Sequence, residues 1–81
     1  MNLIIVDDDS FVSISLKTIL ESSGDVTVLG IGKNGKEAIE LYETHLPDVL
    51  LMDIRMDTMN GLEAAEQILQ LHPDAKILFL T

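Results

Sequence analysis

Two short apolar runs, each ending in aspartate, constrain the fold of this chain more than any other feature. Residues 3–6 are apolar and lead into three consecutive aspartates at 7–9. Residues 49–52 are apolar and lead into Asp53. Continuous apolar runs of this length are typical of parallel strands that are covered on both faces. Because open α/β sheets bind ligands at the carboxyl ends of their strands, we expect these aspartates to mark a functional site.

The rest of the chain alternates helix and strand patterns, which predicts an α/β fold with a parallel sheet. Further strands are expected at 26–29 and 77–80, where short apolar or β-branched runs follow turn residues. The three expected helices are one capped by Ser10 and ended by Gly24, one capped by Asn34 and ended by Pro47, and one opened by Gly61 and closed by Pro73. Helical spacing predicts buried faces made of Val12, Leu16, Ile19, Leu20 and Ser23, then Ala38, Ile39, Leu41, Tyr42 and Leu46, then Leu62, Ala65, Ile68 and Leu69.

Asp7, Asp8 and Asp53 converge if the strands that precede them are neighbours. Three carboxylates so close together would repel one another strongly unless a cation lay among them. A ligand set made only of oxygens suits Mg²⁺, and Mg²⁺ beside a carboxylate nucleophile suggests phosphoryl transfer. The alternative interpretation of residues 7–9 is an acidic first helical turn favoured by the helix dipole. Asp53, at the end of an adjacent buried strand, favours the metal site.

The chain is strongly acidic, with 14 Asp and Glu residues against 5 Lys and Arg residues and a net charge of -9. That charge argues against nonspecific binding to nucleic acid or to anionic membranes, and it favours a cation or a partner with a basic face. The absence of cysteine excludes disulfides and thiolate metal sites. The sequence does not begin with a charged segment followed by a long apolar stretch, so we expect no signal peptide, no membrane span and a cytoplasmic location.

Five segments together resemble the receiver domains of two-component response regulators. They are Ile5-Val6-Asp7-Asp8-Asp9, Asn34-Gly35-Lys36-Glu37-Ala38, Pro47-Asp48-Val49-Leu50-Leu51-Met52-Asp53-Ile54-Arg55-Met56, Met59-Asn60-Gly61 and Lys76-Ile77-Leu78-Phe79-Leu80-Thr81. These segments cover the whole chain in the order expected for that family. The resemblance implies a flavodoxin-like α/β fold, with a parallel sheet of strand order 2-1-3-4 and three helices. It also implies a phosphoprotein that takes part in phosphorelay signal transduction and is not an enzyme.

The resemblance implies a role for each site residue. Asp53 would accept a phosphoryl group from the phosphohistidine of a sensor histidine kinase. Asp8 and Asp53 would ligate Mg²⁺ directly, and Asp7 would do so through water. The backbone carbonyl of Arg55 would be a further ligand, and Thr81 would supply the switch hydroxyl that moves toward the phosphoryl group. The chain is most similar to receivers that precede a helix-turn-helix output domain, which implies control of transcription and contact with DNA only through that domain.

Two features depart from the family pattern. Asp57 stands where the motif usually has proline, which loosens the loop and adds negative charge near Asp53. The sequence stops at Thr81, before the fourth helix, the fifth strand with its lysine and the fifth helix of a complete receiver, so we expect residues 1–81 to be a partial domain that is phosphorylated slowly. The strand at 77–80 would then be an unpaired edge, and we expect a homodimer through this fourth strand.

Two other functions stay open at this point. Gly30, Gly32 and Gly35 have the spacing of a dinucleotide-binding fingerprint after a strand and before a helix. Against that function, the fingerprint belongs after the first strand of its unit, and the aspartates at 7–9 would be unexplained. The third possibility is an interaction module that is never phosphorylated. Such a module would bind neither Mg²⁺ nor NAD, which distinguishes it from the other two.

Overall fold

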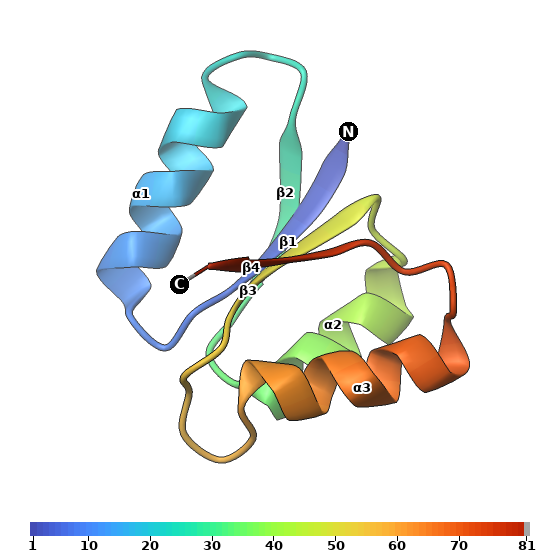
Figure 1. Cartoon of the computed structure of the whole chain (residues 1–81). Helices are drawn as coiled ribbons and strands as arrows, with labels where there is room; N and C mark the ends of the chain where they lie inside the picture. Colours follow the sequence, from blue (N-terminus) through green and yellow to red (C-terminus); the bar gives the residue numbers. More distant parts are fainter. Residues whose placement is uncertain (81) are drawn as a thin grey trace.

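The computed structural model describes residues 1–80, which form one parallel sheet with three helices (Figure 1). In chain order the elements are β1 (Asn2–Val6), α1 (Ser10–Glu21), β2 (Thr27–Gly32), α2 (Gly35–His45), β3 (Val49–Asp53), α3 (Gly61–Leu71) and β4 (Ile77–Leu80). The strands lie in the order β2-β1-β3-β4, and each neighbouring pair is parallel. The predicted fold class and strand order are therefore confirmed. Within the described residues, no helix is both long and apolar enough to cross a bilayer.

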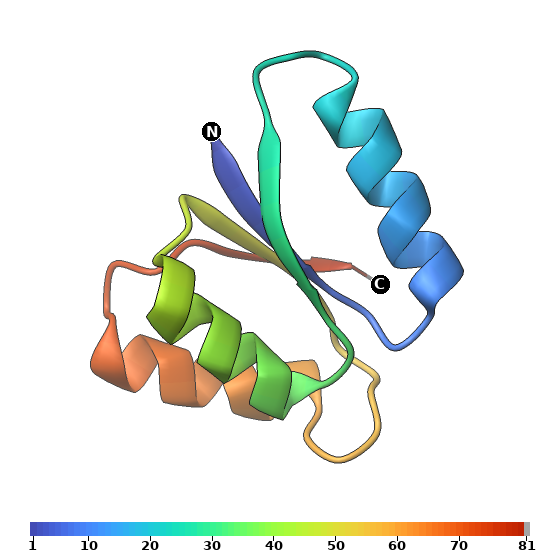
Figure 2. The same cartoon turned by 180° about the vertical axis from the view of Figure 1, so that it is seen from behind.

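Helices cover both faces of the sheet: α1 lies on one face, whereas α2 and α3 lie side by side on the other (Figure 1 and Figure 2). The side chains of β1 alternate between these two layers. Ile4 and Val6 pack in the core beneath α2 and α3, and Leu3 and Ile5 pack in the core beneath α1. Burying a side chain of this kind contributes about 2 kcal/mol, so β1 is held firmly up to the residue before Asp7.

β2 is longer than the sequence indicates, because it runs on through the glycines to Gly32. It pairs with β1 along this length, and the register shifts between Leu3 and Ile4. The extension matters for the neighbouring strand. The backbone N–H of Asp7 donates a hydrogen bond to the carbonyl of Gly32, at 3.0 Å. The end of β2 thus fixes the backbone at the carboxyl end of β1.

Each helix begins with a side chain that accepts hydrogen bonds from its first turn. Asp9, not Ser10 as predicted, caps α1, because its Oδ1 accepts from the N–H groups of Phe11 and Val12 at 2.9 and 3.3 Å. The predicted cap of α2 is confirmed, since Asn34 Oδ1 accepts from the Glu37 N–H at 2.9 Å. In α3, Asn60 takes the same role with Glu63.

Residues near the centre of each predicted helix face are buried as expected, whereas several residues at the edges of these faces are exposed. The predicted residues that pack in the two cores are Leu16, Leu20, Ala38, Ile39, Leu41, Tyr42, Ala65 and Ile68. The predicted residues that are instead exposed are Ile19, Ser23, Leu46, Leu62 and Leu69. The reason is that a helix lying on a sheet buries only a narrow stripe of its surface. Ser13 and Ala64, which the prediction omitted, belong to that stripe and are fully buried.

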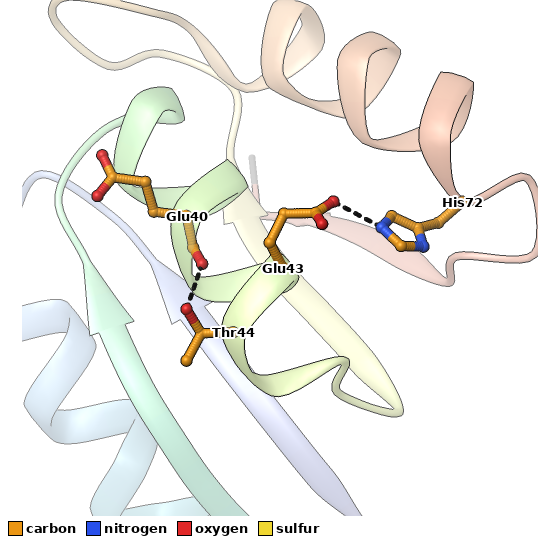
Figure 3. A network of polar contacts seen from close by, with 4 residues as sticks. All are labelled: Glu40, Glu43, Thr44 and His72. Carbon is orange, nitrogen blue, oxygen red and sulfur yellow. Dashed lines mark hydrogen bonds and ion pairs between the residues drawn. The ribbon is translucent and has the colours of Figure 1, made fainter.

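The carboxyl ends of α2 and α3 are joined by a polar contact between two side chains (Figure 3). His72 Nε2 lies 2.6 Å from Glu43 Oε1, and the His72 ring packs 5.1 Å from the ring of Tyr42. Burial raises the pKa of Tyr42, and the charges of Glu43 and Asp74 add to the effect. These contacts give His72 a structural role between the ends of the two helices.

Candidate metal centre

Three carboxylates meet at the carboxyl ends of β1 and β3. Asp7, Asp8 and Asp53 each offer an oxygen, and these oxygens all lie within 4.8 Å of one another. Asp7 is only 7% exposed, Asp53 is half-buried and Asp8 is exposed. The structure therefore brings together the three aspartates that the sequence singled out. Thr81 lies outside the residues that the structure describes.

The sheet itself places these carboxylates side by side. β1 and β3 are hydrogen-bonded neighbours, and Val6 is the register partner of Met52. The residues that follow this pair, Asp7 and Asp53, therefore lie side by side at the carboxyl end of the sheet. Backbone N–H groups then orient both side chains: the Asp9 N–H donates to Asp7 Oδ1 at 2.8 Å, and the Arg55 N–H donates to Asp53 Oδ1 at 3.2 Å.

The cluster stores electrostatic repulsion. Burial raises the pKa of the Asp7 carboxyl, and the negative charges of Asp53, Asp8 and Asp9 raise it further. The hydrogen bond from the Asp9 N–H acts in the opposite direction, because it favours the charged carboxylate. A cation among the three groups would relieve the repulsion and favour the charged form of all of them.

The residues present fit Mg²⁺. The ion takes oxygen ligands at about 2.0–2.1 Å, so two oxygens on opposite sides of it are about 4.2 Å apart. The observed spread of 4.8 Å can close to that value through small side-chain shifts, or one acid can bind through water. The donor set contains neither nitrogen nor sulfur, which favours Mg²⁺ over zinc or copper.

The loop between β3 and α3 forms the other wall of the site. A hollow of about 310 Å³ opens there, lined by Asp8, Ile54, Arg55, Met56, Asp57 and Asn60. Arg55 thus lies beside Asp8, on the exposed side of the cluster. This position is compatible with the predicted role of its carbonyl as a ligand.

Three backbone features define the conformation of this loop, and no local sequence pattern predicts them. The Gly61 N–H donates to the Ile54 carbonyl at 2.8 Å, and the Gly35 N–H donates to the Met59 carbonyl at 2.9 Å. Thr58 has a φ of 72°, and the N–H of Met59 bonds back to the carbonyl of Asp57 at 2.9 Å, which closes a γ-turn. A β-branched residue rarely adopts such a φ, so the fixed ends of the loop impose it.

The glycines of the apparent dinucleotide fingerprint have a packing role. Gly30 and Gly32 lie inside β2 and not in a turn. A Cβ at these positions would come within 3.0 and 3.2 Å of the Leu41 side chain of α2. The Gly35 N–H is already bonded to the Met59 carbonyl, so it is not free to bind a phosphate. The structure therefore argues against the alternative of a dinucleotide site, because close helix packing accounts for the glycines.

Comparisons with known proteins agree with this geometry. Residues 3–81 match the family model of the response regulator receiver domain. The chain is 41% identical over 81 residues to the response regulator protein VraR of Staphylococcus saprophyticus, an alignment that covers 100% of this chain and 39% of VraR. The response regulator domain of Thermotoga maritima CheB superposes with a TM-score of 0.93 at 37% identity, over 98% of this chain and 58% of that one.

A further solved structure is similar to this chain. In the CheX-CheY-BeF3-Mg+2 complex from Borrelia burgdorferi, the matching chain superposes with a TM-score of 0.89 at 27% identity, over 98% of this chain and 60% of that one. The fold and the family match over residues 3–81 agree with each other. The chain belongs to the family of response regulator receiver domains.

Proposed function

We propose that this receiver domain is a phosphoacceptor, in which Asp53 takes a phosphoryl group from the phosphohistidine of a sensor histidine kinase. The observation that carries the proposal is the convergence of three carboxylates within 4.8 Å at the ends of adjacent buried strands. Paired aspartates at such an edge have no role in the two hydrophobic cores. Their mutual repulsion is understandable if the site is built to hold a cation and a transferred anion.

In this proposal each residue of the chain has a defined task. An oxygen of Asp53 attacks phosphorus, the P–N bond of the phosphohistidine breaks, and the imidazole nitrogen that leaves keeps the bonding electrons and can take up a proton. Asp8 and Asp53 would bind Mg²⁺ directly, and Asp7 would bind it through water. The Arg55 carbonyl would complete the protein ligands, and Thr81 would supply the hydroxyl that responds to phosphorylation. Bound Mg²⁺ supplies positive charge that offsets the charge of the phosphoryl oxygens.

The exposure of Asp53 supports it as the acceptor over Asp7. Asp53 is half-buried, and the next residue, Ile54, lines an open hollow, whereas Asp7 is only 7% exposed. The output is proposed to be a separate DNA-binding domain that controls transcription, because the chain is similar to the transcriptional regulatory protein DegU of Brevibacillus brevis, at 38% identity, and to a DNA-binding response regulator of the LuxR family from Staphylococcus aureus, at 31% identity.

The proposal is tested with beryllofluoride, an anion that mimics the phosphoryl group on a carboxylate. With Mg²⁺ present, beryllofluoride should raise the midpoint of thermal unfolding, and Asp53→Asn should abolish the rise. Asp74→Asn, which removes an exposed carboxylate in the turn before β4, is the control and should respond like the unsubstituted chain. Stabilisation by NAD, or no response to either ligand, would contradict a phosphoacceptor and favour a nucleotide-binding or pure interaction role.

A further inference from the structure

Asp57 places an additional carboxylate on the hollow that adjoins the metal centre. Asp57 and Asp8 both line this space of about 310 Å³. The side chain of Asp57 is exposed. The main chain of Asp57 is held by the γ-turn, in which its carbonyl accepts a hydrogen bond from the Met59 N–H. Within residues 1–80 the only ion pair is between His72 and Glu43, so Asp57 has no ion-pair partner in the described chain.

The one basic side chain on the hollow offsets only part of this charge. Arg55 also lines the space, but its guanidinium makes no ion pair with Asp57 or Asp8 within the described residues. Both Arg55 and Asp57 are exposed. The hollow is consequently lined by two acidic residues, Asp8 and Asp57, and one basic residue, which leaves a net negative charge.

We propose that Asp57 determines which phosphodonors the site accepts, favouring a protein donor with basic side chains beside its phosphohistidine and disfavouring small anionic donors. The inference rests on the proposed function and concerns the same site. A negative charge at the mouth attracts Mg²⁺ and a basic donor surface, and it repels a free dianion such as acetyl phosphate. The net charge of -9 on the whole chain likewise attracts cations and basic surfaces and repels small anions.

The size of the effect follows from Coulomb's law. For an assumed separation of about 8 Å in water of low ionic strength, one charge changes the affinity for a divalent ion about fivefold and the affinity for a monoanion about twofold. The change has opposite signs for the two ligands of the site. Removing the Asp57 charge should weaken Mg²⁺ binding and should strengthen the binding of an anion to the Mg²⁺-loaded chain. A change of loop structure has no reason to separate the two affinities in this way.

The experiment compares Asp57→Asn with Asp74→Asn, which removes the same charge at the far end of the strands. Titration calorimetry gives the affinity for Mg²⁺ alone and then for beryllofluoride at saturating Mg²⁺. We expect Asp57→Asn to weaken the first about fivefold and to tighten the second, whose ligand is a monoanion, about twofold, and we expect both changes to shrink as salt is added. Asp74→Asn should leave both affinities unchanged.

The possible results separate this inference from the proposed function. If the two variants behave alike, or if both affinities move in the same direction in Asp57→Asn, the role of Asp57 is refuted while the phosphoacceptor proposal stands. If the unsubstituted chain binds neither Mg²⁺ nor beryllofluoride, the proposed function itself fails. A competition between acetyl phosphate and a phosphorylated histidine protein with a basic surface completes the test, because Asp57→Asn should shift the preference toward acetyl phosphate.

Discussion

Gly61 lies so close to the main chain of Asp53 that a Cβ atom at position 61 would overlap the Asp53 carbonyl oxygen. The Gly61 N–H also donates to the carbonyl of Ile54 at 2.8 Å. The first residue of α3 and the last residue of β3 are therefore in direct contact, with no side chain between them. This contact sets where the loop of residues 54–60 leaves the sheet and returns to it.

Gly61→Ala should destabilise the fold by about 2 kcal/mol or more, because the backbone at Asp53 must move to admit the methyl group. Alanine has the better helix propensity, so propensity alone predicts the opposite sign. Gly24→Ala is the matched control: Gly24 has a φ of 83° but no atom within 4 Å of a Cβ there. Its cost should be about 1 kcal/mol, from backbone conformation only. Urea unfolding measures both, and equal stability of Gly61→Ala and the unsubstituted chain would refute the contact.

Mg²⁺ should stabilise the folded chain, because a ligand that binds only the native cluster shifts the folding equilibrium. At ten times its Kd the gain is about 1.4 kcal/mol. Asp8→Ala and Asp53→Ala should each abolish the gain. Asp53→Ala also removes repulsion, so its metal-free form should be at least as stable as the metal-free unsubstituted chain. Thermal melts of the unsubstituted chain that coincide with and without Mg²⁺ would show that no such site is assembled.

The raised pKa of Asp7 predicts how metal-free stability depends on pH. The ordinary pKa of an aspartate, which Asp7 has in the unfolded chain, is 3.8, and its pKa in the folded chain is higher. At a pH between these two pKa values the folded chain therefore binds more protons than the unfolded chain. The contribution of Asp7 to stability is therefore fully present below 3.8 and is lost as the pH rises through the raised value. Asp7→Asn should remove this loss, whereas Asp25→Asn, at an exposed position, should retain it. Urea unfolding at a series of pH values without metal tests this, and an identical pH dependence for Asp7→Asn and the unsubstituted chain would contradict it.

β4 presents an apolar edge in the described part of the chain. It pairs with β3 alone, and Leu78 and Phe79 are 59% and 38% exposed. We predict that the 81-residue chain self-associates by antiparallel pairing of two β4 strands. Leu78→Lys should give a monomer, whereas Leu71→Lys, at an equally exposed position at the end of α3, should not. Sedimentation at micromolar concentration measures the oligomeric state of each chain. A folded monomer of the unsubstituted chain would contradict the pairing.

The sequence predicts the centre of the fold well because burial is strongest there. The apolar runs that precede Asp7 and Asp53 are continuous, and only neighbouring central strands bury such runs on both faces. The helix edges were predicted less well, because spacing gives the direction of an apolar face but not the width that a sheet covers. Leu46 shows this, since it has the left-handed φ of 45° of a helix end and lies exposed.

The details of the site depend on contacts between distant segments. Gly30 and Gly32 match a phosphate-binding pattern because close approach of a ligand and close approach of a helix both require glycine. Nothing local predicts the conformation of Thr58, since β-branched residues disfavour positive φ. That conformation follows from the anchoring of the loop by Gly35 and Gly61. Asp9 and Ser10 are both good caps, and only the structure distinguishes them.

The most direct measurement of the central claim is chemical mapping of the acceptor. The chain is incubated for a prolonged period with acetyl phosphate and Mg²⁺, and borohydride then reduces any aspartyl phosphate to homoserine, which peptide mass spectrometry locates. We predict homoserine at position 53 alone, with a yield that disappears when Mg²⁺ is chelated. Homoserine at position 7, 8 or 57, or an unmodified position 53 after exhaustive incubation, would contradict the assignment of Asp53 as the phosphoacceptor.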